Sequence, residues 1–250
     1  MTPEKMNQLM QTPRIDFIHA IQNKDIAQCL IKTAEIHGHY CPGSAFGVMA
    51  SLWGLELLQT EHPNMDPEKT ASSGMEDLMA VVETNACFAD GIQAVSGCTL
   101  GNNALVYRDL GRFAVTFALR GQKTGVRVRI RGDFRSHVEH ALPEFFGLME
   151  KVIKNRKGTP EDEAEFREKG REAAFALIKR PFETLLTAEK IVPSLPPYAP
   201  ISPSHVCPDC GETVMATKVV DQGEKKGVCF ICAGKGFHEL EGRGIIKNKG

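Results

Sequence analysis

Three side chains that can bind a metal or act as nucleophiles lie within five positions, in the sequence His37-Gly-His39-Tyr-Cys41. Pro42 follows where the first turn of a helix is expected, so we predict that Cys41 lies near the N-cap. The helix dipole there lowers a thiol pKa and favours a thiolate, which serves as a nucleophile or as a soft metal ligand. The alternative is that the histidines cap helix ends and Cys41 is a small buried apolar residue. Three such residues together, flanked by glycines, favour a functional site.

Two more cysteines, Cys87 and Cys98, follow strand and turn signals and have polar neighbours. Alone, each is typical of a buried core thiol. With the preceding turn they become candidates to complete a single site. Cys29 lies in the apolar stretch IAQCLI, and we interpret it as a packing residue.

The remaining four cysteines form two CxxC pairs, which are Cys207-Pro-Asp-Cys210 and Cys229-Phe-Ile-Cys232. Four thiolates at this spacing predict a tetrahedral Zn²⁺ site. The site is expected to be structural, because four thiolates leave no open coordination position. A module this small has little core, so metal binding would supply folding free energy on the order of 10 kcal/mol. Residues 213–220 and 227–230 are expected to pair and bring the two CxxC motifs together.

Two other roles of this C-terminal module are less favoured. A thioredoxin-type redox role needs one CxxC, and the presence of two favours metal binding. DNA binding needs a cationic surface, whereas this module has mixed charges (Asp209, Glu212, Asp221 and Glu224 against Lys218, Lys225 and Lys226). Contact with another protein, or a scaffold role, fits this charge pattern better.

The composition limits the class of protein. A chain of 250 residues with 42% hydrophobic content can bury a core without disulfides. Its net charge of −1 argues against nucleic-acid binding. The sequence has no apolar run long enough for a transmembrane helix, and its first residues lack the apolar core of a secretory signal. Paired CxxC thiols without an export signal predict a cytoplasmic protein with metal-bound cysteines.

Helical patterns precede and follow the predicted site. Residues 16–37 have apolar side chains at three- and four-residue spacing, which predicts one amphipathic helix. Residues 44–59 predict a buried helix, in which Gly47 and Gly54 on one face would allow another backbone to approach closely. Further helices are expected over 90–95, over 137–153, and from the capping residue Thr159 to about Arg180.

Strands are predicted at 78–83 and at 113–119 and 126–131, and the last two are expected to form a hairpin. The five prolines of 193–203 predict a stiff, extended linker. The domain organisation that we expect is therefore a core domain over 1–192, a linker over 193–204 and a zinc finger over 205–250.

Three motifs and the C-terminal module together resemble the E-subunit family of formylmethanofuran dehydrogenase. The motifs are the HGHYCPG turn at 37–43, VETNACFADGIQ at 82–93 and GCTLG at 97–101. The proline-rich linker and the final CPDCGE and CFICAG segments match members with an added zinc finger. The resemblance covers most of residues 15–235. It departs at Asn102 and Asn103, where members often carry lysine and glycine.

The resemblance implies an α+β core domain with a small antiparallel sheet and packed helices, and a C-terminal treble-clef-like zinc finger. It also implies association with molybdenum- or tungsten-dependent oxidation of formylmethanofuran in one-carbon metabolism. The site that it implies consists of His37, His39, Cys41, Cys87 and Cys98, with Glu83, Asp90 and Gln93 nearby.

Three hypotheses about function follow. In the first, Cys41, one of the two histidines, and Cys87 or Cys98 bind a second transition metal, in an accessory protein of a molybdenum or tungsten enzyme. In the second, Cys41 is a catalytic thiolate, His39 is its base, and Cys87 or Cys98 is the resolving thiol of an oxidoreductase. In the third, the protein is a non-catalytic adaptor. The expected partners are a second copy of the chain, through the glycine-bearing helix, and components of molybdenum or tungsten enzymes.

Overall fold

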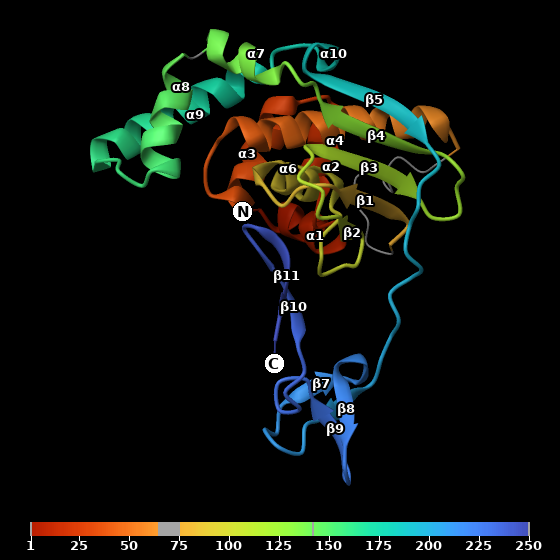
Figure 1. Ribbon diagram of the computed structural model, residues 1–250. Coiled ribbons are helices and arrows are strands. Elements are labelled where there is room, and N and C mark those ends of the chain that lie inside the picture. The colour runs from red at the N-terminus through yellow and green to blue at the C-terminus, as the bar shows by residue number, and fades with distance from the viewer. Residues whose placement is uncertain (1, 65–75, 142, 250) are drawn as a thin grey trace. The chain divides into compact units, whose positions relative to one another are not determined.

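The computed structural model describes residues 2–64, 76–141 and 143–249. The chain divides into two compact units, Met1–Pro196 and Pro197–Gly250. Figure 1 shows the first unit as helices around one sheet and the second as a set of short strands. The predicted α+β class is confirmed.

A five-stranded sheet forms the centre of the first unit. Its strands, in the order β2-β1-β3-β4-β5, are β1 (Leu78–Val82), β2 (Leu105–Tyr107), β3 (Ala114–Leu119), β4 (Gly125–Ile130) and β5 (Leu186–Ile191). The predicted hairpin is confirmed, since β3 and β4 pair antiparallel. The pair β1–β2 is parallel, and the other pairs are antiparallel.

The first helices of the chain are α1 (Pro3–Gln11), α2 (Ile15–Gln22) and α3 (Ile26–His37). The prediction of one helix over 16–37 was wrong. The break has a local cause: Lys24 has a left-handed φ of 53°, and the Asp25 side chain accepts a hydrogen bond from the Gln28 N–H to cap α3. The apolar periodicity continues through the break because α2 and α3 both pack on the same core.

The predicted buried helix is α4 (Pro42–Glu61), and α6 (Cys87–Ser96) crosses it closely. A Cβ added at Gly47 would lie 2.2 Å from the backbone oxygen of Phe88 in α6, and one at Gly91 of α6 would lie 2.6 Å from the Ser44 oxygen. Gly54 packs closely against the ring of Phe117 in β3. The glycines of α4 therefore serve contacts within the chain, which removes the reason for assigning them to a dimer interface.

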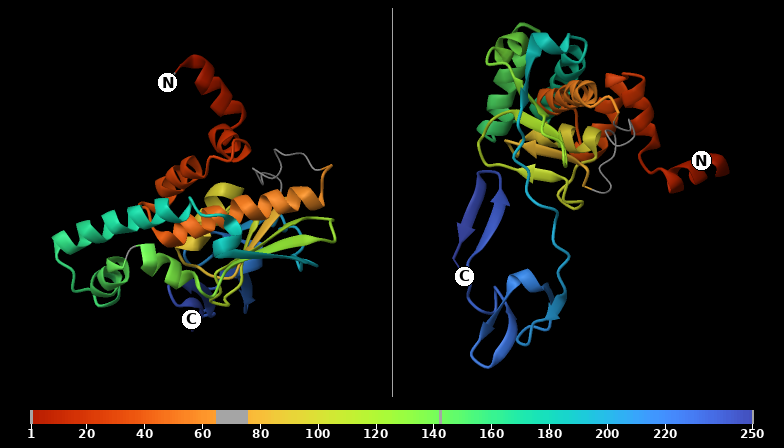
Figure 2. Two further views of the ribbon diagram at one scale, coloured as in Figure 1. Left: turned by 90° about the horizontal axis from the view of Figure 1, so that it is seen from above. Right: turned by 90° about the vertical axis from the view of Figure 1, so that its right-hand side faces the viewer.

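A helical arm follows the hairpin. It consists of α7 (Phe134–Ala141), α8 (Glu144–Met149), the π-helix η1 (Glu150–Lys154), α9 (Pro160–Leu177) and α10 (Phe182–Leu185). Helix α9 begins at the predicted cap, where Thr159 and Asp162 form a reciprocal capping box. Figure 2 shows from above how α9 extends beyond the sheet on the side of the α3–α4 turn.

The proline-rich segment begins on the first unit. Arg108 and Arg120 donate hydrogen bonds to the backbone oxygens of Ser194 and Pro196, and Leu195 packs on the core. The prolines of this segment lack the N–H that a strand ladder needs. Its carbonyls still accept, and here they accept from side chains of the core. The division between the two units lies after Pro196.

The second unit contains three short antiparallel hairpins and a 3₁₀ turn, η2 (Ala216–Lys218). Strand β6 (Ser204–Val206) pairs with β7 (Thr213–Met215), β8 (Val219–Gln222) with β9 (Lys225–Cys229), and β10 (Phe237–Glu241) with β11 (Gly244–Asn248). The predicted pairing of 213–220 with 227–230 was thus right only for 219–220. The turn η2 separates β7 from β8, so that β7 pairs with the segment that precedes the first CxxC.

Within the described residues, no helix combines the length and the apolar character that crossing a bilayer would require.

Candidate functional site

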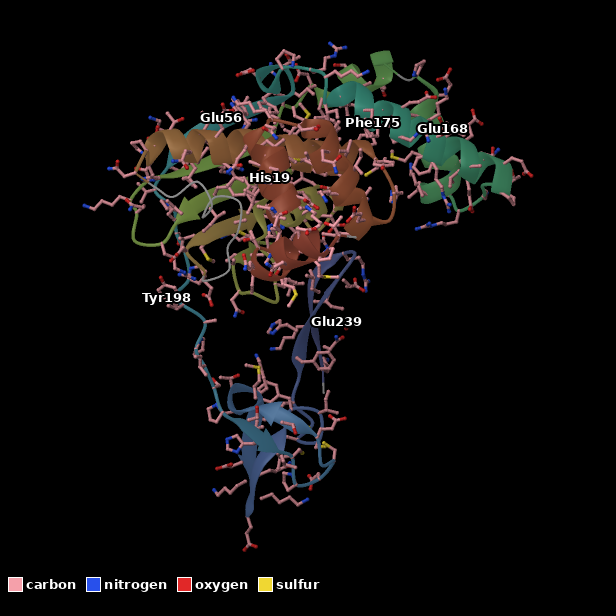
Figure 3. All side chains as sticks on the ribbon, turned by 180° about the vertical axis from the view of Figure 1, so that it is seen from behind. His19, Glu56, Glu168, Phe175, Tyr198 and Glu239 are labelled. Atoms are coloured by element: carbon pink, nitrogen blue, oxygen red, sulfur yellow. The ribbon has the colours of Figure 1, made fainter. Side chains whose placement is uncertain are left out.

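The HGHYC turn connects the end of α3 to the start of α4. Gly38 follows His37 with a φ of 83°, a left-handed conformation that ends α3 and that glycine adopts without steric cost. Tyr40 then packs on Phe175 of α9, with ring centroids 5.2 Å apart; Figure 3 labels Phe175. These contacts return the chain so that Cys41 becomes the N-cap of α4.

A line of polar contacts runs from α6 to this cysteine. Asp90 Oδ2 lies 2.7 Å from His37 Nδ1, and His37 Nε2 lies 3.5 Å from Cys41 Sγ. Gln93 donates a hydrogen bond to the other oxygen of Asp90 at 3.3 Å. The side chain of His37 is only 10% exposed. Asp90 therefore fixes the imidazole so that Nε2 points at the sulfur, as a carboxylate does for a metal-binding histidine.

Cys41 is poised to be a thiolate. It replaces the usual serine of a capping box, so its Sγ accepts a hydrogen bond from the Ser44 N–H at 3.3 Å. Cys87, in the first turn of α6, lies close by, since its sulfur and that of Cys41 are each 3.7 Å from the position of a Cβ added at Gly43. Hydrogen bonds from Cys87, His37 and Ser44 lower the pKa of Cys41 well below its usual range, although burial opposes this effect. The thiolate in turn raises the pKa of Cys87 and, with Asp90, raises the pKa of His37 to about 9.

His39 completes a group of three possible metal ligands. One ligand atom from each of His37, His39 and Cys41 lies within 4.8 Å of the others, and the ring centroids of the two histidines are 4.4 Å apart. His37 and Cys41 are largely buried, whereas His39 is exposed. One thiolate and two imidazoles form a donor set that suits zinc and other late transition metals. The residues present thus fit a metal with one open coordination position.

The family described as "FmdE, Molybdenum formylmethanofuran dehydrogenase operon" matches residues 36–187, which include this entire site. The chain belongs to the FmdE family.

Two known proteins are similar to this FmdE-family chain. It is 37% identical over 234 residues to a probable S-adenosyl-L-methionine-binding protein of Archaeoglobus fulgidus. That match covers 94% of the chain and 60% of the relative, so the chain spans less than two thirds of that protein. A crystal structure of an FmdE-like protein of the tungsten formylmethanofuran dehydrogenase type, from Syntrophus aciditrophicus, is 22% identical, with a TM-score of 0.48, over 84% of the chain and 92% of that protein.

Three residues that the family resemblance places at or near the site of this FmdE-family chain lie outside the group of possible ligands: Cys87, Cys98 and Glu83. Cys98 follows α6, whereas Cys87 begins it, and a helix of ten residues is about 15 Å long. The Cys98 thiol is fully buried and donates to the Leu78 oxygen at 3.5 Å. Glu83 accepts two hydrogen bonds from Arg127 of β4, at 2.7 and 2.9 Å. The prediction of a metal ligand at Cys98 is therefore corrected, because the length of α6 separates it from Cys87.

The four C-terminal cysteines converge as their spacing predicts. One ligand atom from each lies within 4.8 Å of the others, and the sulfurs of Cys210 and Cys229 are 4.0 Å apart. Sulfurs bound to one zinc ion at about 2.3 Å are expected about 3.8 Å apart. The backbone N–H of Cys229 donates to Cys207 Sγ at 3.4 Å, and such donors lower the pKa of Cys207 to about 6. Gly211, after the first CxxC, has a positive φ of 76°. The donor set fits a metal ion with no open coordination position.

Ser44 is a site residue that was not predicted from the sequence. A serine three positions after a predicted N-cap is the signal that identifies it, since this is the second position of a capping box. The cavity beside His39 was not predicted either; residues of η1 and α9 form its wall across from the turn.

Proposed function

We propose that this protein is a metal-binding accessory protein of the FmdE family, with a transition-metal site at the HGHYC turn and a structural zinc site in its C-terminal unit. The observation that carries the proposal is the line Asp90–His37–Cys41, with His39 beside it. A buried histidine that is held by a carboxylate and points at a thiolate is the arrangement of a metal ligand with its outer-shell partner.

The first site would use His37 Nε2 and Cys41 Sγ as its inner ligands and His39 as the exposed one. A metal there would act as a Lewis acid or as a redox centre, depending on its identity. The residues of the chain would supply the rest: Ser44 stabilises the thiolate, Asp90 fixes the imidazole, and Gln93 holds Asp90. The exposure of His39 leaves this side of the site open to a ligand.

The second site would hold zinc through Cys207, Cys210, Cys229 and Cys232. Its donor set is closed, so its role is to fold the unit around it. The four sulfurs join the knuckle after β6 to the end of β9, two segments whose shared buried core is small.

The wider role would be in one-carbon redox metabolism that depends on molybdenum or tungsten. The family description supports this, since it refers to the operon of such a dehydrogenase. The Archaeoglobus relative is named as a probable S-adenosyl-L-methionine-binding protein, but this chain spans only 60% of it. We therefore base the proposal on the metal-binding geometry and not on that name. A cytoplasmic location would suit a protein in which none of the eight cysteines, all of them within the described residues, forms a disulfide. Components of the dehydrogenase remain the proposed partners. A second copy of the chain is proposed on family analogy alone, since the glycines of α4 serve contacts within the chain.

Metal content of variants tests this function. Purified under metal-replete, reducing conditions, the wild-type chain should hold two metal ions, and Cys41→Ser and His37→Ala should each hold one. Cys98→Ala, a buried thiol at the other end of α6, is the matched control and should hold two. A Cys41→Ser variant with the same metal content as the wild type would refute the core site.

A thiol-dependent oxidoreductase is the second candidate. The closeness of Cys87 to Cys41 favours it, since both sulfurs lie 3.7 Å from the position of a Cβ added at Gly43. The Cys41 thiolate would attack a disulfide co-substrate and release its first sulfur as a thiolate. Cys87, on losing its proton, would then displace the second sulfur. The pair would end as a Cys41–Cys87 disulfide after transfer of two electrons and one proton. In the structure, His37 rather than His39 would be the partner of the thiolate. Alkylation of the metal-free protein at pH 6 should then be much faster at Cys41 than for free cysteine. A rate no faster than that of free cysteine would exclude this function.

A further inference from the structure

A cavity of about 550 Å³ opens directly beside the metal-ligating group. Its wall begins at Gly38 and His39 of the turn and continues on the far side with residues of η1, the loop after it, and α9. This volume lies within the range of pockets that bind small molecules. Because His39 is both a cavity wall and a candidate ligand, a molecule in the cavity would reach the first coordination shell.

The charge of the cavity wall favours an anionic ligand. Arg156 and Arg167 both line the cavity, and within the described part of the chain neither guanidinium forms a hydrogen bond or an ion pair. Other arginines of the arm are paired, such as Arg135 with Glu139 and Arg171 with Glu168. The cavity also contains Glu163, which leaves the positive charges in excess.

The remaining wall is apolar. Phe166 is half-buried, Val152 is buried, and Ile153 is exposed at the rim. An aromatic ring and two branched aliphatic side chains favour a ligand with an apolar body, which would displace water from them. The cavity therefore combines an apolar surface with two cations.

The backbone that presents Arg156 is unusual. It follows a π-helix, a conformation that is rare and frequent at functional sites. Arg156 itself has a left-handed φ of 52°, which costs energy for a residue other than glycine. Gly158 then packs so closely that an added Cβ would lie 2.9 Å from Val152. Together these features place Arg156 in the wall of the cavity at an energetic cost, while the residue stays exposed and open to a ligand.

We propose that this cavity binds a small organic anion, a carboxylate or a phosphate with an apolar body. Its anionic group binds Arg156 and Arg167, and its body lies on Phe166 and Val152. This inference rests on the proposed function, because it places the ligand of the metal centre on the side of His39. Guanidinium groups bind carboxylates and phosphates alike through paired hydrogen bonds, so either kind of anion would suit this cavity.

Calorimetric titration of the full-length protein tests this inference with four probes: phenyl phosphate, phenylacetate, and the uncharged benzyl alcohol and cationic benzylamine as controls. At least one anion is expected to bind with a dissociation constant in the millimolar range, as suits its size, and neither control should bind. Phosphate and carboxylate sources are distinguished by which anion binds more tightly. If neither anion binds, or if the controls bind equally well, the inference is refuted.

Two variants locate the binding. Arg156→Ala and Arg167→Ala should each weaken anion binding about tenfold or more, since each removes a hydrogen bond to a charged group. Arg171→Ala, one turn further along α9 and outside the cavity, is the matched control and should leave affinity unchanged. Anion binding that survives both cavity substitutions would place the anion elsewhere and overturn the proposal. Metal content is measured on the same samples. If the core metal is present but no anion binds, only the cavity proposal is refuted. The metal content of Cys41→Ser tests the metal site independently of anion binding.

Discussion

The carboxylate of Asp90 lies 2.7 Å from Nδ1 of His37, two residues that are 53 positions apart in the chain. This contact fixes which ring nitrogen faces Cys41, because the nitrogen bound to Asp90 is the protonated one in the neutral ring. A substitution of Asp90 therefore tests the orientation of His37 while leaving the metal ligand itself in place.

We predict that Asp90→Asn weakens metal binding at the core site about 10- to 100-fold, the usual effect of losing an outer-shell partner. Competition with a chromophoric chelator measures the affinity of each site. Asp16→Asn, which removes a carboxylate from α2 of the same unit, is the control and should have no effect. If Asp90→Asn binds metal at the core site as tightly as the wild type, His37 is not oriented by this contact.

The contact also illustrates what the sequence can predict. Cys207, Cys210, Cys229 and Cys232 were identified from spacing alone, because paired CxxC motifs determine their own local geometry. The HGHYC turn was identified for a similar reason: its three donors are neighbours in the chain. Asp90 was placed near the site only through the family resemblance, since its approach to His37 depends on how α6 packs against α3.

Cys98 shows the limit of that resemblance. A motif shared within a family indicates which residues occur together in the sequence. Whether two of them are in contact depends on the length of the helix between them. The helix predicted over 90–95 lies between Cys87 and Cys98, and the structure extends it to Cys87–Ser96, so that Cys87 begins α6 and Cys98 follows its end. The cavity beside His39 was unpredictable in the same way, because its walls come from the turn and from an arm that lies far along the chain.

The close crossing of α4 and α6 predicts that Gly47→Ala destabilises the first unit. The new methyl group would lie 2.2 Å from a backbone oxygen, so one helix must move, at a cost of about 3 kcal/mol or more. Urea unfolding, followed by the fluorescence of the single tryptophan, Trp53 of α4, measures it. Gly132→Ala, where an added Cβ meets nothing within 4 Å, should change stability by less than about 1 kcal/mol. Equal effects of the two substitutions would contradict this close packing.

The pair of Glu83 and Arg127 predicts a dependence of stability on pH. Arg127 lowers the pKa of Glu83 below its usual value, so the unfolded chain binds more protons and this contribution rises with pH. It is fully present above about pH 4.3, the pKa of an unfolded glutamate, and is lost as pH falls through the lower folded pKa. Glu83→Gln should therefore destabilise the first unit by roughly 2 to 3 kcal/mol at pH 7, since Arg127 keeps its bond to Glu189.

Thermal unfolding of Glu83→Gln and wild type, again followed by Trp53, measures this difference at several pH values. The difference in stability between the two proteins should narrow steadily below about pH 4. A gap that stays constant down to pH 2.5, or widens there, would show that the ion pair is not the source of the stability.

The two units should respond differently to loss of the C-terminal site. Cys210→Ser is expected to release the metal and remove amide-exchange protection from β8 and β9, because the small core of this unit cannot replace it. The Trp53 unfolding transition of the first unit should stay within about 1 kcal/mol of the wild type. Cys41→Ser should show the reverse pattern, with protection in β8 and β9 intact. Unchanged protection in Cys210→Ser would mean that metal does not fold this unit.

The most direct measurement of the core site is anomalous diffraction from crystals of the metal-loaded protein. We predict a peak at the HGHYC turn, about 2.3 Å from Cys41 Sγ and about 2.0 to 2.1 Å from His37 Nε2, in addition to the peak among the four C-terminal sulfurs. A single peak at the C-terminal cysteines, with the turn free of metal in fully loaded protein, would contradict the proposed metal centre.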